Sequence, residues 1–172
     1  TLPDSTVINY TYNKLNKETK KEVKKSDVII SEERTYDSQG NVTSLKDANG
    51  NTTTYVYNAQ NNMIKEQKPN QVITTYEYDL AGNVTRETLP NNKSNTEYIY
   101  NLYNQPITKK VNYLVGENLN TITTSYEYDN LDNLLKETTG DKVLEYTYNK
   151  SGKCTSKKDA NLNTTTYEYD VN

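Results

Sequence analysis

The chain has 172 residues, a formal net charge of −3 and 17 tyrosines, but no histidine, phenylalanine or tryptophan. Without histidine it lacks the commonest general base, and its 20 basic and 23 acidic residues do not give the strongly basic balance of a nucleic-acid-binding domain. The mean hydropathy of −1.03 leaves few aliphatic side chains for a closed core, so tyrosine must supply the apolar surface of strands joined by polar turns.

The tyrosines recur as pairs two residues apart. Successive second members are 20 to 28 residues apart, most often 21, and a period of this length is typical of a repeat architecture. One further copy has Arg34 where the first tyrosine should stand. The signature tyrosines are Tyr10 and Tyr12, Tyr36 alone, Tyr55 and Tyr57, Tyr76 and Tyr78, Tyr98 and Tyr100, Tyr126 and Tyr128, Tyr146 and Tyr148, and Tyr167 and Tyr169.

Each copy reads Tyr-x-Tyr-[Asp/Asn]-x-x-[Gly/Asn]-x-apolar, which predicts a strand, a tight turn and a return strand. Tyrosines at i and i+2 of a strand share one face. The Asp or Asn that follows can bond its own backbone, and the Gly or Asn three positions later tolerates the left-handed conformation. The signature residues of these turns are Asp79, Gly82, Asn83, Asp129, Gly152 and Asp170.

A second turn closes each copy. Asn49-Gly50, Asn161-Leu162 and Asn91-Asn92 each stand between two strand-like runs, and Asn-Gly is a strong hairpin signal. Each copy therefore contributes two antiparallel strands. The predicted fold is all-β: an antiparallel hairpin meander of about 21-residue units that forms a curved, spiralling sheet.

Two copies are enlarged. Residues 14–36 predict a long hairpin that turns near Ser26-Asp27, although a helical turn over Glu18 to Lys25 is an alternative. Residues 105–126 predict a protruding hairpin around Gly116 to Asn118. Residues 1–172 are thus expected to form a single array of about eight copies.

Because side chains alternate along a strand, the tyrosine pairs also predict which residues lie on each face of the sheet. Val72, Thr74, Ile122, Thr124 and Leu144 should lie on the tyrosine face. The opposite face should carry Glu77, Glu127, Glu145 and Thr147. A sheet with one apolar-aromatic face and one charged face is typically covered on one side only.

No catalytic, cofactor or metal site is predicted. Cys154 takes the position that Val, Met or Leu occupies in sister copies, so it is interpreted as a small strand hydrophobe. The DxxGN stretches resemble calcium loops, but the twelfth positions hold Ala48, Pro90 and Asn58 where a bidentate Glu is needed. No apolar stretch is long enough for a membrane span or a signal peptide.

The ends suggest a piece of a longer array. The opening TLPDSTVINYTYN resembles the internal TLPNNKSNTEYIYN, and the chain stops at YEYDVN, within a turn. Edge strands with unpaired backbone groups are expected to associate with one another, which predicts edge-to-edge self-association.

These copies, YEYDLAGNVTRETLP above all, resemble the YD repeat of the Rhs (rearrangement hot spot) family, whose pattern is Tyr-x-Tyr-Asp-x-x-Gly-Asn-Leu. The resemblance covers essentially the whole chain. Departures keep turn-forming residues: Asn58, Asn101 and Asn149 replace the aspartate, and Asn61, Asn104 and Asp132 replace the glycine.

The resemblance implies a secreted or surface-displayed bacterial protein whose repeats wind into a hollow β-shell around a toxic C-terminal domain. The expected partners are neighbouring repeats and that effector domain. A second hypothesis is a cell-surface-binding module in which exposed tyrosines stack on sugar rings. Mutually packed tyrosines would favour the wall, and exposed tyrosines would favour glycan binding.

Overall fold

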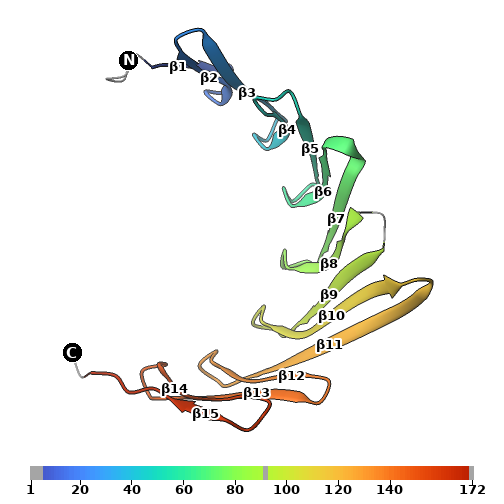
Figure 1. Ribbon diagram of the computed structural model, residues 1–172, viewed down its shortest axis with the longest axis vertical. Helices are drawn as coiled ribbons and strands as arrows, with labels where there is room; N and C mark the ends of the chain where they lie inside the picture. The colour runs from blue at the N-terminus through green and yellow to red at the C-terminus, as the bar shows by residue number, and fades with distance from the viewer. Residues whose placement is uncertain (1–5, 91–92, 171–172) are drawn as a thin grey trace. The chain divides into compact units, whose positions relative to one another are not determined.

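The computed structural model describes residues 6–90 and 93–170, and its strands form one antiparallel sheet in which each strand neighbours the next along the chain (Figure 1). The predicted all-β meander is therefore confirmed. The strands are β1 (Val7–Tyr12), β2 (Glu18–Lys25), β3 (Val28–Tyr36), β4 (Val42–Lys46), β5 (Thr52–Tyr57), β6 (Met63–Lys68), β7 (Val72–Tyr78), β8 (Val84–Thr88), β9 (Ser94–Tyr100), β10 (Pro106–Val115), β11 (Asn118–Tyr128), β12 (Leu134–Thr139), β13 (Lys142–Tyr148), β14 (Cys154–Lys158) and β15 (Thr164–Thr166).

The chain divides into two compact units. Unit 1 comprises Thr1–Glu77 with Leu89–Asn91, and unit 2 comprises Tyr78–Thr88 with Asn92–Asn172. Strands β1 to β6 lie in unit 1, and strands β8 to β15 lie in unit 2. The predicted turn at Asn91-Asn92 lies outside the described residues.

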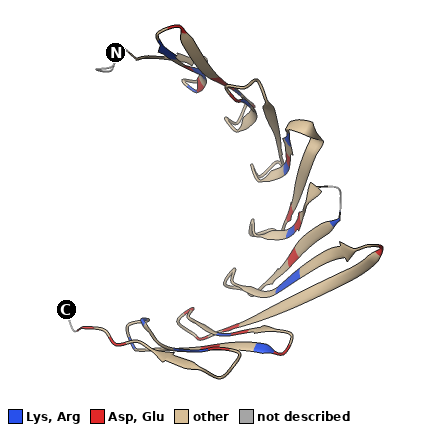
Figure 2. Cartoon of the chain, viewed as in Figure 1, with Lys and Arg blue, Asp and Glu red and all other residues tan. Residues whose placement is uncertain are grey.

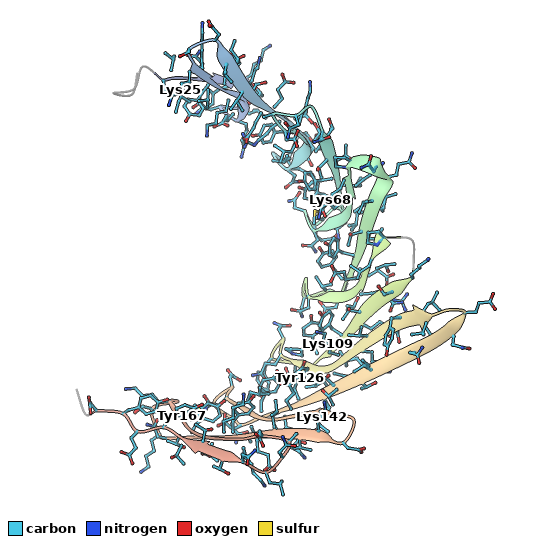
Figure 3. All side chains as sticks on the ribbon, in the orientation of Figure 1. Lys25, Lys68, Lys109, Tyr126, Lys142 and Tyr167 are labelled. Atoms are coloured by element: carbon cyan, nitrogen blue, oxygen red, sulfur yellow. The ribbon has the colours of Figure 1, made fainter. Side chains whose placement is uncertain are left out.

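The side chains of each strand alternate between two faces, as the sequence pattern predicts. In β7, Thr74 is buried and Tyr76 is half-buried, whereas Glu77 is exposed. In β11, Thr124 is buried and Tyr126 is half-buried, whereas Glu127 is exposed. Side chains stand on both faces of the strands throughout (Figure 3).

The fold lacks a closed apolar core in the part of the chain that the structure describes, since no hydrophobic side chain there is fully buried. The buried side chains in this part of the chain are instead Thr6, Thr74 and Thr124, which are 6 to 9% exposed. Stability must therefore come from the backbone hydrogen bonds of the hairpins and from the half-buried tyrosine face.

The two longest hairpins turn through two residues each. Lys25 pairs with Val28, so Ser26 and Asp27 form the turn between β2 and β3. Residues Glu18–Lys25 are the strand β2, so the helical alternative for this segment is wrong. Lys20 and Lys21 lie opposite Glu33 and Glu32 of β3, and opposite charges across a ladder favour the strand.

A β-bulge follows each tyrosine-pair turn whose register is described. Thr35 pairs with Ser44 and Tyr36 pairs with Val42, so Thr43 has no partner of its own. The bulge turns Thr43 and Ser44 toward the same hydroxyl, that of Thr35, at 2.8 and 2.6 Å. The other skipped residues are Thr19, Ile64, Ile107, Leu135 and Thr155. Bulges bend a strand and increase its twist.

Candidate functional site

The tyrosine-pair turns share one geometry, shown by the turn that follows Tyr36. The backbone N–H of Asp37 donates to the carbonyl oxygen of Asn41 at 3.0 Å, and the N–H of Gly40 donates to that of Asp37 at 3.2 Å. Asp37 Oδ1 accepts the N–H groups of Gln39 and Asn41, both at 2.9 Å. The Asx-type turn that the sequence predicts is therefore present.

The second turn of a copy uses the same chemistry. Asp47 accepts the N–H groups of Asn49 and Asn51, and Gly50 has a φ of +83°. The predicted hairpin between β4 and β5 thus forms, and its loop consists of the three residues Ala48 to Gly50. Asp159 accepts the N–H groups of Asn161 and Asn163 in the same way, with Leu162 at the left-handed position.

Turn aspartates are held in their ionised form. The side-chain amide of Asn41 donates to Asp37 Oδ2 at 3.0 Å, and this hydrogen bond is the main cause that lowers the pKa of Asp37. The corresponding asparagine lowers the pKa of each of four further turn aspartates: Asp47, Asp79, Asp129 and Asp159.

The second tyrosine of a pair bridges to the neighbouring hairpin. The paired positions of β4 and β5 stop at Ser44 and Thr54, so Val42 and Tyr57 lie beyond the ladder. The Tyr57 hydroxyl donates to the carbonyl oxygen of Val42 at 3.0 Å and satisfies an acceptor that the ladder leaves open.

This tyrosine bridge recurs along both units. Each acceptor is the first residue of a strand, and the oxygen-to-oxygen distances run from 2.5 to 3.0 Å. The further bridges are Tyr36 to Glu18, Tyr100 to Val84, Tyr128 to Pro106, Tyr148 to Leu134 and Tyr169 to Cys154.

Interior tyrosines are partly withdrawn from water. Burial is the main cause that raises the pKa of the phenols of Tyr57, Tyr78, Tyr100, Tyr126, Tyr128 and Tyr148. The pairs nearest the chain ends are more open: Tyr10 and Tyr12 are 47% and 53% exposed, and Tyr167 and Tyr169 are 42% and 44% exposed. Tyr55, Tyr98 and Tyr146 are half-buried first members of their pairs.

Neighbouring turns are also linked by their side chains. Asn41 Nδ2 donates to Asn61 Oδ1 at 2.8 Å, and Asn83 Nδ2 donates to Asn104 Oδ1 at the same distance. Gln105 Nε2 donates to Asp132 Oδ1 at 3.1 Å. The three acceptors are the residues that replace glycine in the repeat pattern, so these departures supply a side chain that binds the preceding turn.

Residues of opposite charge lie on neighbouring strands (Figure 2). In unit 2 the cross-strand partners run Glu127, Lys136, Glu145 and Lys158. The ion pair of Lys136 with Glu127 measures 3.3 Å, and that of Lys158 with Glu145 measures 3.1 Å. Because these side chains are well exposed, each pair adds little to stability.

The residues singled out as chemical candidates are not brought together. Cys154 is half-buried, and its thiol lies 3.3 Å from the carbonyl oxygen of Ser156. Within residues 6–90 and 93–170, no three His, Cys, Asp or Glu side chains are placed to hold a metal ion. No helix among these residues is long and apolar enough to cross a membrane.

Signature residues take their places in the repeat as follows. Gly82 and Gly152 occupy the left-handed turn positions, with φ of +88° and +74°. The side-chain amide of Asn83 donates a hydrogen bond to Asp79 Oδ2. Asp170 lies beyond β15 and is exposed. The bridging hydroxyls and the turn-to-turn amides were not expected from the sequence. A tyrosine ends the strand before most of these turns, but which carbonyl oxygen its hydroxyl reaches depends on the neighbouring strand.

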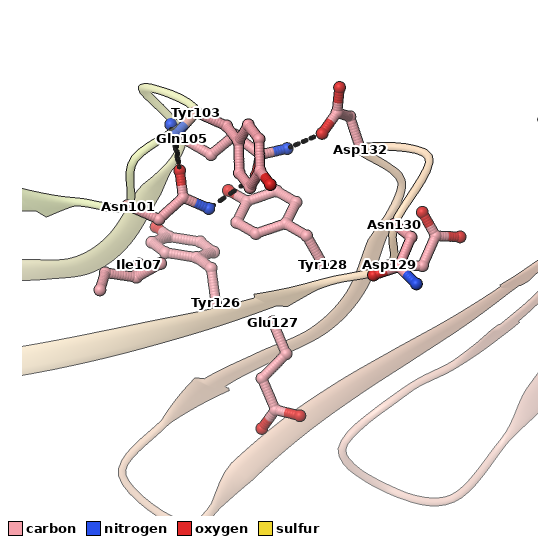
Figure 4. Close-up of a pocket in the computed structure, with 10 residues that line it drawn as sticks. All are labelled: Asn101, Tyr103, Gln105, Ile107, Tyr126, Glu127, Tyr128, Asp129, Asn130 and Asp132. Carbon is pink, nitrogen blue, oxygen red and sulfur yellow. Dashed lines mark hydrogen bonds between the residues drawn. The ribbon is translucent and has the colours of Figure 1, made fainter.

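A pocket of about 650 Å³ opens in unit 2 between the turns that follow Tyr100 and Tyr128 (Figure 4). The rings of Tyr103, Tyr126 and Tyr128 lie on one side of β11, and Glu127 points to the other side. The side-chain hydrogen bonds from Asn101 to Gln105 and from Gln105 to Asp132 form part of its wall.

Residues 36–73 match the family model of the RHS Repeat. No curated protein sequence matches the chain significantly. A crystal structure of TcdB2-TccC3 matches 86% of the chain at 17% sequence identity and a TM-score of 0.74, and the chain spans 9% of its length. A structure of the Photorhabdus luminescens Tc holotoxin pore matches 83% at 18% identity and a TM-score of 0.71, and the chain spans 8% of its length.

These solved structures share the fold of the chain, and the family model covers the segment from Tyr36 through β4, β5 and β6 into β7. That segment contains both kinds of turn and the bridge from Tyr57 to Val42. The segment that the RHS Repeat model matches therefore contains the repeat predicted from the tyrosine pairs.

Proposed function

We propose that this chain is a segment of the wall of a hollow β-shell that encloses a toxin or effector domain of a secreted or surface-displayed protein. The observation that carries the proposal is the use made of the second tyrosines, whose hydroxyls bind the backbone of the neighbouring hairpin. The second tyrosines, which recur in every copy, therefore bind one repeat to the next, as the wall of a shell requires.

Two further features support a structural role. The side-chain amides between successive turns add a second row of links. The charged side chains on the face opposite the tyrosines are paired with each other across the strands, rather than gathered as a site for a charged substrate. The partners of the segment are then neighbouring repeats and the enclosed domain.

The glycan-binding alternative has weaker support. It needs aromatic rings that are free to stack on sugars, but the interior tyrosines are half-buried and several of their hydroxyls are occupied. The exposed pairs nearest the chain ends are the rings that would remain available. Glycan binding stays a prediction, and a glycan array probed with this chain would test it.

The wall proposal is tested by proteolysis of the intact protein that contains this chain. Replacing Tyr57, Tyr100 and Tyr148 together by phenylalanine removes three bridges and should make the enclosed domain sensitive to added protease. The matched control replaces Tyr55, Tyr98 and Tyr146, the first members of the same pairs, and should retain protection. An effector domain that is already cleaved freely in the unaltered protein would contradict encapsulation.

A further inference from the structure

One wall of the pocket is the turn after Tyr100, and this turn has a feature that the other turns lack. Tyr103 is the third residue of its turn and is 78% exposed. The same position in the sister turns holds no aromatic residue: it is Leu15, Gln39, Asn49, Gln60, Ala81, Leu131, Ser151 or Asn161. The turn therefore forms without an aromatic side chain, and Tyr103 is free to serve the pocket.

The pocket is acidic and has no cation of its own. Its lining contains the carboxylates of Glu127, Asp129 and Asp132 but no lysine or arginine. Glu127 points away and pairs with Lys136, and the carboxylate of Asp129 accepts hydrogen bonds within its own turn. Negative charge beside three aromatic rings is an environment that attracts an organic cation.

Asp132 is the available counter-ion. Its Oδ1 atom accepts the Gln105 amide at 3.1 Å, which fixes the carboxylate at the edge of the pocket. Within the described part of the chain, its Oδ2 atom has neither a hydrogen bond nor an ion pair. Gln105 Oε1 accepts the Asn101 amide at 2.7 Å, so the amides of this wall are already engaged with each other.

The repeat itself shows which cation fits beside such a ring. Lys153 ends the turn that begins at Asn149, and its Nζ atom lies 5.0 Å from the centre of the Tyr169 ring. The Tyr169 hydroxyl binds the carbonyl oxygen of Cys154, the residue after Lys153. This distance is within the range of a cation–π contact.

Gln105 and Tyr128 occupy the equivalent positions in the pocket. Gln105 ends its turn, and the Tyr128 hydroxyl binds the carbonyl oxygen of Pro106, the residue after Gln105. The turn position that carries a lysine near Tyr169 therefore carries a neutral amide here, and that amide donates to Asp132. A cation at this ring has to come from elsewhere.

We propose that this pocket binds the ammonium group of a lysine side chain presented by another polypeptide segment. The rings of Tyr103, Tyr126 and Tyr128 surround the ammonium group, and the free carboxylate oxygen of Asp132 is its counter-ion. Tyr103 is 78% exposed, so a side chain can reach its ring from solvent.

The test is an NMR titration of the full chain labelled with ¹⁵N, with Nα-acetyl-lysine N-methylamide as the probe. We expect saturable shifts at the backbone amides of Tyr103, Asn130 and Asp132, and weaker binding as salt is added. The Nα-acetyl-norleucine analogue and the Nζ-acetylated lysine analogue, which lack the charge, should give no saturable shift.

Two substitutions locate the interaction. Asp132→Asn keeps the oxygen that accepts from Gln105 and a residue that tolerates the left-handed conformation, but removes the charge. Tyr103→Leu keeps an apolar side chain but removes the ring. Each should weaken binding by about threefold to tenfold, whereas the control Asp27→Asn, which removes an exposed turn carboxylate in unit 1, should leave the affinity unchanged.

Several results would overturn the proposal. The uncharged analogues could bind as well as the lysine probe, or both pocket variants could retain full affinity. Saturable shifts with N-acetylglucosamine or spermidine, but none with the lysine probe, would assign the pocket to a sugar or to a free polyamine instead. Absence of any shift at 100-fold molar excess, about 10 mM probe for a weak contact of this kind, would also count against it.

Discussion

The hydroxyl of Tyr57 donates a hydrogen bond to the carbonyl oxygen of Val42, 3.0 Å away, at a point where the ladder between β4 and β5 has ended. The two strands are paired from Ser44 and Thr54 toward their shared turn, and they are joined by a side chain at the other end. The same relationship between a strand-ending tyrosine and a strand-starting carbonyl recurs from Tyr36 to Tyr148, and Tyr169 makes the same hydrogen bond from beyond β15.

Tyr57→Phe should destabilise the chain by about 1 kcal/mol, because the Val42 carbonyl loses a partner while the ring remains. Tyr55→Phe is the control, since Tyr55 is the first member of the same pair and its hydroxyl makes no hydrogen bond in the described part of the chain. Urea unfolding of both variants measures the difference. Equal midpoints for the two would show that the bridge contributes nothing.

Acid should weaken the turns that begin with aspartate. The pKa of Asp129 is lowered in the folded chain, chiefly by the Asn133 amide, so its contribution is present above the unfolded pKa of about 3.9 and is lost as pH falls through the folded value. Asp129→Asn should therefore reduce the loss of unfolding free energy as the pH is lowered, which urea unfolding at a series of acidic pH values measures.

Turns that begin with asparagine instead of aspartate provide the control for this pH dependence. Asn101 and Asn149 begin their turns with a neutral side chain that accepts the same two backbone N–H groups. Asn149→Asp should add acid sensitivity. An acid limb that is identical in the unaltered chain and both variants would rule out the turn aspartates as its source.

A new link between turns can be built at Gly152. A Cβ atom on Gly152 would lie 3.6 Å from Asn133 Oδ1, an ordinary contact, and asparagine tolerates its φ of +74°. Gly152→Asn should therefore reproduce the pairing of Asn83 with Asn104 and stabilise the chain by about 0.5 kcal/mol. Thermal unfolding compares it with Gly152→Ala, which has no amide and should destabilise by about 1 kcal/mol. Two variants with the same stability would argue against the link.

Leu162 is strained by its backbone. It has a φ of +68° and is 73% exposed, in the position that Gly50 holds in the sister turn. Leu162→Gly should stabilise the turn by about 1 kcal/mol, and Gly50→Leu should destabilise by a similar amount. Hydrogen exchange at the amides of the two turns measures both changes, and slower exchange in Gly50→Leu would contradict the expectation.

The strands and turns were predictable because their signals are local. Two tyrosines at i and i+2, followed by Asp79 and then Gly82, specify a face, an Asx-type turn and a left-handed residue within seven positions. The hairpin at Asn49-Gly50 was predictable from the Asn-Gly pair, and Asp47 sets its loop at three residues by accepting the N–H of Asn51.

The bridges and bulges were not predictable because they depend on neighbouring strands. Whether Tyr57 reaches Val42 is decided by where the ladder of β4 and β5 ends. The bulge at Thr43 is decided by the registry of β3 against β4. The pocket also depends on two turns that are 27 residues apart at the Gln105 to Asp132 hydrogen bond, a juxtaposition that only the folded sheet creates.

Cryo-electron microscopy of the intact protein tests most directly whether this chain is part of a shell wall, as we propose. The account predicts that β1 to β15 lie in the wall of a closed shell, with the tyrosine bridges between successive hairpins and separate density enclosed by the wall. Strands that lie outside any shell, or a shell in which the second tyrosines make no contact with the adjacent hairpin, would contradict it.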